Sequence, residues 1–142
     1  MVELISNKEE VYELLKKHFE SYSLNDPFEK IAVYNDNGVK GVISYSIIYE
    51  RAEVNYIVVL KEYRGNNIGN KLLNYALADM KKSCFTVSLE VASDNAAAIN
   101  LYLKNGFTVE ATRPKYYKDK DGYLMVKDLR WFGEYIYSCN WI

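Results

Sequence analysis

The chain contains few of the residues that build metal centres and disulfide frameworks. Its 142 residues include two cysteines, Cys84 and Cys139, and one histidine, His18. Two cysteines at this separation match no common metal-ligand spacing and make no disulfide framework. A zinc site or a Ser-His-Asp triad is hard to build around a single histidine. We therefore expect no bound metal, and we expect Cys84 to fill space in the core.

An excess of one charge and a long apolar run are also missing. The chain has 18 basic and 19 acidic residues, a formal net charge of −1, so no basic surface suggests a nucleic-acid partner. No run reaches the length of a transmembrane helix, and the N-terminus lacks a signal-peptide pattern. We expect a cytoplasmic protein without a membrane partner. The length and the apolar content of 49% fit a single domain, residues 1–142.

The order of the expected elements favours an α+β fold. Periodicity and turn residues predict strands over 2–5, 31–34, 39–49, 52–60, 86–91, 107–118 and 123–129. They predict helices over 11–22, from Ile68 to Met80, and from a cap at Ser93 or Asp94 to Asn105. Strands dominate the first part, and two strand–helix units follow. This order indicates a mixed sheet flanked by helices rather than a doubly wound parallel sheet.

A turn rich in glycine and asparagine joins the fourth strand to the second helix. Glycine takes positive φ without a steric cost, and asparagine tolerates that geometry better than most residues. Backbone N–H groups in such a turn, together with those of a helix N-terminus, can bind a pyrophosphate. An ordinary strand-to-helix turn is the alternative. The turn contains Arg64, Gly65, Asn66, Asn67, Ile68, Gly69 and Asn70.

This turn and a second block resemble the GNAT superfamily of acyl-CoA-dependent N-acyltransferases. The family's phosphate loop is Arg/Gln-x-x-Gly-x-Gly/Ala, and Asn67 stands at its first glycine. The second block is Leu-Glu-Val-Ala-Ser-Asp-Asn-Ala-Ala-Ala-Ile-Asn-Leu-Tyr at 89–102, with Gly-Phe at 106–107. It is similar to the bacterial ribosomal-protein-alanine N-acetyltransferase branch, and the resemblance covers about residues 52–129. It implies a central mixed, mostly antiparallel sheet and an acetyl-CoA-dependent N-acetyltransferase.

The resemblance also implies where acetyl-CoA binds. The strand backbone at Ile57, Val58 and Val59 would contact the pantetheine and the acetyl group. The loop from Arg64 to Asn70 would hold the pyrophosphate. Asn95 would bind the pantetheine arm.

Two residues match the catalytic positions of the resembled family. Glu90 corresponds to the general base and Tyr102 to the general acid, while Glu53 on the preceding strand is the rival base. A carboxylate base suits an amine that is mostly protonated at neutral pH. Because no Cys or Ser has an evident nucleophile setting, we expect direct attack in a ternary complex.

The resemblance implies a primary amine as the acceptor, either a protein N-terminus or a peptide, with Tyr116 and Tyr117 beside it. Adjacent strand residues point to opposite faces, so only one tyrosine can face a groove unless a bulge intervenes. A small-molecule amine is the alternative acceptor. A non-catalytic CoA-binding regulatory module is another alternative, against which Glu90 and Tyr102 argue. His18 lies on an apolar helix stripe, which favours core or groove packing over catalysis.

The last residues, 130–142, form an apolar extension that includes two tryptophans. Such a tail either packs on its own domain, which we favour slightly, or forms a dimer contact. The sequence therefore leaves a monomer and a homodimer open.

Overall fold

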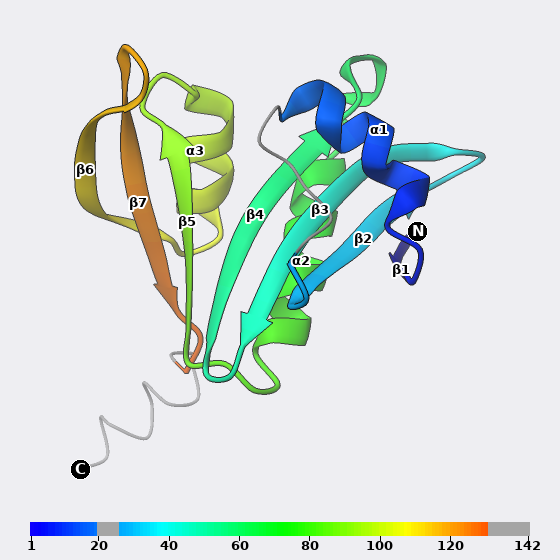
Figure 1. Ribbon diagram of the computed structural model, residues 1–142, viewed down its shortest axis with the longest axis horizontal. Coiled ribbons are helices and arrows are strands. Elements are labelled where there is room, and N and C mark those ends of the chain that lie inside the picture. The colour runs from blue at the N-terminus through cyan, green and yellow to red at the C-terminus, as the bar shows by residue number, and fades with distance from the viewer. Residues whose placement is uncertain (20–25, 131–142) are drawn as a thin grey trace.

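The computed structural model describes residues 1–19 and 26–130 (Figure 1). The described part contains seven strands, three α-helices and one short 3-10 helix. In chain order these are β1 (Val2–Ile5), α1 (Glu9–His18), β2 (Glu29–Asn35), β3 (Val39–Ile48), β4 (Arg51–Val59), η1 (Lys61–Tyr63), α2 (Ile68–Met80), β5 (Thr86–Ala92), α3 (Ala96–Lys104), β6 (Thr108–Tyr117) and β7 (Lys120–Asp128).

The strands form one mixed sheet with the order β1-β2-β3-β4-β5-β7-β6. Every neighbouring pair is antiparallel except β4 and β5, which run parallel. Parallel strands need a crossover connection, and α2 provides it. The predicted α+β fold with a mostly antiparallel mixed sheet is thus confirmed.

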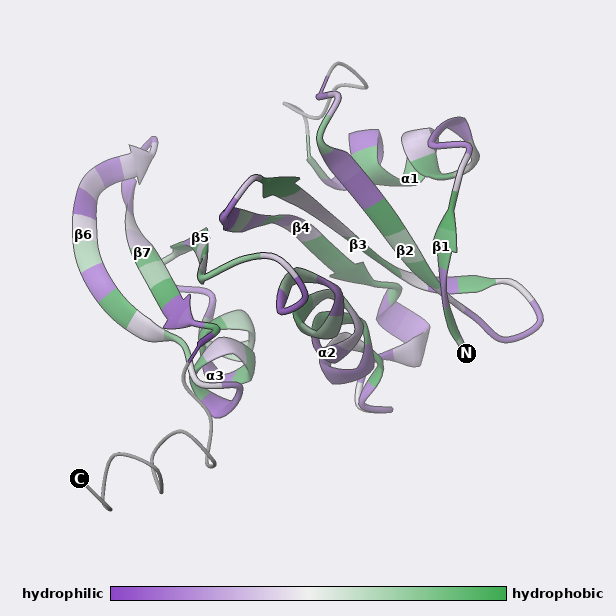
Figure 2. Ribbon diagram, turned by 90° about the horizontal axis from the view of Figure 1, so that it is seen from below, coloured by the Kyte–Doolittle hydropathy of each residue, from purple (hydrophilic) through white to green (hydrophobic). Residues whose placement is uncertain are grey.

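The helices cover both faces of the sheet, with α1 on one face and α2 and α3 on the other (Figure 2). The larger core lies between the sheet and α2, where Leu72, Leu73 and Met80 are fully buried. The smaller core packs Val11 and Leu15 of α1 against the other face. Strands β2 and β3 therefore bury alternate side chains in two different cores.

The parallel strands β4 and β5 separate soon after they begin. Their pairing runs only from Arg51 opposite Thr86 to Glu53 opposite Ser88, although β4 continues to Val59 and β5 to Ala92. The two strands diverge toward their carboxyl ends in Figure 1. The described residues thus leave a split in the middle of the sheet, and backbone groups along its edges are open to a ligand.

A bulge at Asn55 reverses the faces of β4. Tyr45 of β3 pairs with Val54, whereas its neighbour Ser44 pairs with Tyr56, so Asn55 is the extra residue. Before the bulge Val54 packs in the larger core, and after it Tyr56 packs in the smaller one. A period-two pattern along β4 would place Glu53, Asn55 and Ile57 on one face, and this pattern fails because the bulge inserts one residue.

Other boundaries also differ from the sequence prediction. Helix α1 ends at His18, and position 22 lies outside the described residues. The N-cap of α3 is Asn95 rather than Ser93 or Asp94, because the Asn95 carboxamide oxygen accepts the Ala98 N–H at 3.2 Å. The last hairpin turns at residues 118–119, earlier than expected, with Lys118 at φ 57°.

The apolar tail from residue 131 onward lies outside the described residues. In the described part, no helix is long and apolar enough to cross a membrane. Cys84 is buried, as the sequence predicted.

Candidate active site

A cavity of about 680 Å³ opens on the side of the split where β4 meets α2 and α3. Its walls are the end of β4, the Gly/Asn turn, the N-terminus of α2 and one face of α3. Arg64 and Lys104 are among its described lining residues, which include no carboxylate. The cavity therefore suits an anionic ligand. We call it the donor cavity, because it brings together residues predicted to bind the acetyl donor, acetyl-CoA. These are Ile57, Val58, Val59, Arg64, Gly65, Asn67, Ile68, Gly69, Asn70 and Asn95.

The turn before α2 adopts the left-handed geometry that its sequence indicates. Gly65 has φ +86° and Asn67 has φ 63°. Asn67 is also the N-cap of α2, and no side chain caps that helix end. Helix N-termini carry N–H groups without intrahelical partners. Those of α2 face the cavity together with a partial positive charge from the helix dipole.

Gly69 acts differently from the prediction, because it lies inside α2 rather than at positive φ. A Cβ at this position would lie 3.6 Å from a Leu101 methyl and 3.8 Å from a Val59 methyl, which are ordinary contacts. The fold itself therefore tolerates a side chain at Gly69. Because Gly69 has no side chain, the space beside it remains part of the cavity.

Two predicted donor residues shape the loop through their own side chains. Arg64 Nε donates to the Val59 carbonyl at 3.0 Å, and Asn66 Nδ2 donates to the Tyr63 carbonyl at 3.0 Å. Asn66 is not among the residues that line the cavity, so its predicted contact with the donor would come from its backbone N–H. Its side-chain hydrogen bond supports the turn.

A smaller cavity of about 290 Å³ lies in the split itself. It shares Ile57, Asn95 and Ala98 with the donor cavity, and it is also lined by Glu90 and Tyr102. Both predicted catalytic side chains therefore lie between β4 and β5, next to the donor cavity.

Glu90 projects into the split from β5. Its neighbours Leu89 and Val91 are buried in the larger core, because adjacent strand residues face opposite sides of the sheet. The carboxylate oxygen Oε1 lies 3.2 Å from Arg113 Nη2. The other oxygen, Oε2, is buried and has no hydrogen-bond partner among the described residues. A buried acceptor without a donor is costly, so Oε2 is suited to receive a proton donor from a substrate.

Tyr102 is nearly buried on α3, and its ring packs on Phe107 with centroids 5.6 Å apart. Burial raises the pKa of its phenol, and Tyr117 adds to this shift. The pKa of Tyr117 is also raised, by burial first and then by Tyr116 and Glu90. Both phenols therefore keep their protons at neutral pH and can donate hydrogen bonds.

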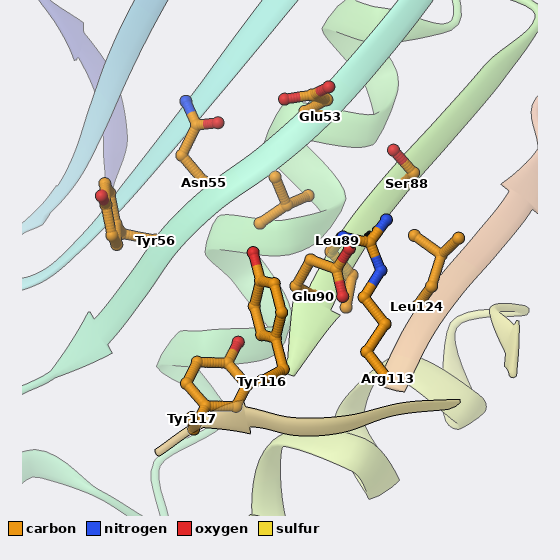
Figure 3. A pocket seen from close by; sticks show the side chains of 11 residues that line it. Glu53, Asn55, Tyr56, Ser88, Leu89, Glu90, Arg113, Tyr116, Tyr117 and Leu124 are labelled. Carbon is orange, nitrogen blue, oxygen red and sulfur yellow. Dashed lines mark ion pairs between the residues drawn. The ribbon is translucent and has the colours of Figure 1, made fainter. Parts of the chain in front are cut away.

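A third pocket, of about 470 Å³, is lined by residues of β4, β5, β6 and β7 (Figure 3). It shares Val54, Asn55, Tyr56, Glu90 and Tyr117 with the cavity in the split. The three spaces thus adjoin one another along the split. The rival base Glu53 lines this third pocket, which we call the acceptor pocket.

Tyr116 and Tyr117 both line the acceptor pocket, because a bulge interrupts β6. Arg113 pairs with Gly122 and Tyr117 with Lys120, so three residues of β6 oppose one residue of β7. The two tyrosine rings meet edge to face, with centroids 4.9 Å apart and planes at 86°. The limit of one groove-facing tyrosine therefore does not apply to this strand.

One hydrogen bond and one glycine support this bulge. Lys115 has φ 53°, and its backbone N–H donates to Asp121 Oδ1 at 3.0 Å. Gly122 leaves room for the Tyr116 ring, since a Cβ there would lie 3.0 Å from Tyr116 Cβ and Cδ2.

Several lining residues were not predicted from the sequence. They are Phe19 and Lys104 in the donor cavity and Asn55, Tyr56 and Arg113 in the acceptor pocket. Phe19 and Tyr56 stack with centroids 4.4 Å apart at the edge of the split. Only Arg113 had a local signal, because it lies three residues before the tyrosine pair.

His18 is exposed, so core packing is wrong for this residue, and it lies at the rim of the donor cavity. Its Nδ1 is 3.0 Å from the Leu14 carbonyl oxygen. Within residues 1–19 and 26–130, no cluster of His, Cys, Asp and Glu could hold a metal ion.

Comparison with known proteins identifies the family. The model of the Acetyltransferase (GNAT) family matches residues 3–107. An N-alpha-acetyltransferase of Sulfurisphaera tokodaii is 39% identical over 85 residues, which are 58% of this chain and 51% of that protein. The chain thus spans about half the length of this relative.

Two further proteins extend the comparison. A putative [ribosomal protein bS18]-alanine N-acetyltransferase of Bacillus subtilis is 31% identical over 106 residues, which are 73% of this chain and 70% of that protein. The crystal structure of Arabidopsis thaliana Naa50 in complex with the bisubstrate analogue CoA-Ac-MVNAL has a TM-score of 0.73 and 26% identity. The structural match covers 89% of this chain and 98% of the Naa50 chain.

The chain therefore belongs to the GNAT family of acetyltransferases, whose enzymes use acetyl-CoA. The family predicted from the Gly/Asn turn and the 89–107 block is confirmed, and its relatives include the ribosomal-protein-alanine branch.

Proposed function

We propose that the protein transfers the acetyl group of acetyl-CoA to the primary amine of a peptide or protein N-terminus. One observation supports this proposal: the cavity in the split, lined by Glu90 and Tyr102, shares lining residues with both the donor cavity and the acceptor pocket, so the three adjoin. Two substrates that enter from opposite sides would meet in the split, so no acyl-enzyme is needed. The relatives named as N-alpha-acetyltransferases support a peptide acceptor.

The donor cavity would bind acetyl-CoA by its phosphates and its pantetheine arm. Backbone N–H groups from Gly65 to Asn70 would hold the pyrophosphate at the N-terminus of α2. The open edge of β4 at Ile57 to Val59 would pair with the amide groups of the pantetheine, as a neighbouring strand does. Asn95 uses its oxygen to cap α3, so its amide nitrogen remains to donate to the same arm.

The reaction needs the amine to lose a proton and the leaving sulfur to gain one. Glu90 would accept the proton from the amine, directly or through a water molecule, as nitrogen attacks the thioester carbon. The carbon–sulfur bond breaks, and the Tyr102 hydroxyl would donate to the departing sulfur. Because burial raises the pKa of Tyr102, the phenol would keep its proton and stabilise the developing thiolate by a hydrogen bond, and the released thiolate would take its proton from water. A backbone N–H near Val58 would stabilise the oxyanion.

A small-molecule amine is the second candidate. A CoA-binding module without turnover is the third candidate, and it differs in giving no product.

The test is to incubate the protein with acetyl-CoA and a panel of peptides with free N-termini, peptides with blocked N-termini, and small amines. Thiol release and the mass of the product report transfer. We expect transfer to free peptide N-termini only. Transfer to small amines alone would favour the second candidate, and CoA binding without any thiol release would favour the third.

A further inference from the structure

The acceptor pocket holds two carboxylates and one guanidinium. Glu53 of β4 and Glu90 of β5 line it, and Arg113 of β6 reaches Glu90, with Nη2 3.2 Å from Oε1 (Figure 3). The remaining described lining residues are neutral. An acceptor with an ammonium group near a negative group would match this distribution.

Arg113 is available to bind a second partner. Its Nη2 lies 3.2 Å from Glu90 Oε1, and its side chain is 50% exposed. Its Cζ lies 5.4 Å from the centre of the Tyr116 ring, which orients the guanidinium plane. A guanidinium carries five N–H donors in a planar fork. One contact with Glu90 therefore leaves donors that can bind another carboxylate.

Glu90 offers a binding position for the amine next to the Arg113 guanidinium. Its Oε2 is buried and has no hydrogen-bond partner among the described residues, so it can receive the amine of the acceptor. Arg113 already lies beside the other oxygen of the same carboxylate. The amine and a negative group of the same acceptor would thus bind a few ångströms apart.

On the basis of the proposed function, we infer that the acceptor carries a carboxylate close to its reactive amine, and that Arg113 binds this carboxylate. The carboxylate can belong to an acidic side chain at the first or second position of a peptide. It can also be the α-carboxylate of a free amino acid. Both sources present the same chemistry to Arg113, and the experiment separates them.

The test compares amidated peptides that begin with Ala followed by Glu, Gln or Lys, together with free amino acids. For the wild-type protein we expect the acceptor KM of the Glu peptide to be roughly tenfold lower than that of the Gln peptide. Arg113→Gln should abolish this preference, Arg113→Lys should restore part of it, and Arg113→Glu should favour the Lys peptide. Added salt should weaken the preference. Equal KM values for Glu and Gln substrates, among peptides and among free amino acids alike, would overturn the inference.

Lys120→Gln is the matched control. Lys120 is a basic residue of the same hairpin that pairs with Asp94 at 2.9 Å and does not line the acceptor pocket. Its loss should leave the Glu preference intact. A preference for free glutamate or alanine over acidic peptides would assign the carboxylate to an amino acid instead of a side chain.

A peptide-binding measurement tells a failure of this inference apart from a failure of the proposed function. Fluorescence anisotropy of labelled Glu and Gln peptides on the CoA-loaded protein needs no turnover. Arg113-dependent binding of the Glu peptide without acetyl transfer would contradict the proposed function alone. Acetyl transfer that ignores the second residue and Arg113 would contradict this inference alone.

Discussion

Asn55 Nδ2 lies 2.8 Å from Ser46 Oγ, so the extra residue in the β4 bulge is held by the neighbouring strand. The same amide nitrogen is 3.3 Å from Ser44 Oγ. Both serines are buried. Ser44 donates a hydrogen bond to Glu29, and Ser46 donates one to Asp26. This polar network on the α1 face fixes the strand from which Glu53 and Tyr56 enter the acceptor pocket.

We predict that Asn55→Ala weakens both the fold and acceptor use. The substitution removes two hydrogen bonds from buried serines, which typically costs about 1–3 kcal/mol. It also frees the bulge, so kcat/KM for the acceptor should fall while donor affinity stays level. Urea unfolding and steady-state kinetics measure the two effects. Asn35→Ala, which removes hydrogen bonds at the β2–β3 turn, should lower stability without changing the kinetics.

Substitutions at the two glycines of the donor loop should have opposite effects on stability. Gly69→Ala should stabilise the free protein by up to about 1 kcal/mol, because alanine favours a helix and the fold has room for its methyl. Gly65→Ala should destabilise it by roughly 1–2 kcal/mol, because Gly65 has φ +86°. Thermal melting of the free proteins measures both.

The Gly69→Ala variant also tests where acetyl-CoA binds. Saturation at 100 times the dissociation constant should stabilise the wild type by about 2.7 kcal/mol. Gly69→Ala should lose most of this gain, because its methyl occupies space beside the ligand. An undiminished gain would mean that the first turn of α2 does not contact the phosphates.

Glu90→Gln should lower kcat by roughly 10²–10⁴-fold with little change in donor affinity, because an amide cannot take the proton. Glu53→Gln, which alters the same pocket from β4, should have a much smaller effect on kcat. Stopped-flow or steady-state thiol release measures both variants. The reverse order of the two effects would move the base to Glu53.

Tyr116→Ala and Tyr117→Ala should each raise the acceptor KM, since the β6 bulge turns both rings toward the pocket. Gly122→Ala should have a similar effect, because its methyl would lie 3.0 Å from Tyr116 Cβ. The donor KM should remain level in all three. Val109→Ala, an exposed position on the same strand, is the control. Unchanged acceptor kinetics in the folded fraction of all three variants would exclude the tyrosine pair from acceptor binding.

Asp79 should make the stability of the fold fall in acid. Its carboxylate accepts from Lys30 Nζ and from the Tyr45 hydroxyl, both at 2.7 Å. Burial by itself raises the pKa of Asp79, but these hydrogen bonds outweigh it, so the pKa lies below its usual value of 3.8. A lowered pKa means that the stabilisation is complete above about pH 4 and is lost as the pH falls through the folded-state pKa.

The Asp79→Asn variant tests this dependence. It should be less stable than the wild type at neutral pH, and its free energy of unfolding should change less below pH 4. Asp128→Asn serves as the comparison, because the pKa of Asp128 is also lowered, by Arg130, but the pair is exposed and screened by solvent. If the free energy of unfolding of Asp79→Asn still falls as steeply below pH 4 as that of the wild type, other carboxylates cause the loss of stability in acid.

The amino-acid sequence by itself determined the order of the elements and the positions that depend on local geometry. The period-two pattern of β5 placed Glu90 opposite Leu89 and Val91, because alternate strand residues face opposite sides. The left-handed geometry of Gly65 and Asn67 also followed from the sequence, because backbone sterics act within single residues.

Only the tertiary structure decided where this alternation fails. The bulge at Asn55 depends on serines of β3, and the bulge before Tyr117 depends on Asp121 and Gly122 of β7. Partners on another strand fix such irregularities, so a pattern read along one strand does not reveal them. For the same reason the Arg113–Glu90 pair, 23 positions apart in the sequence, emerges only when β6 and β5 come together on either side of β7.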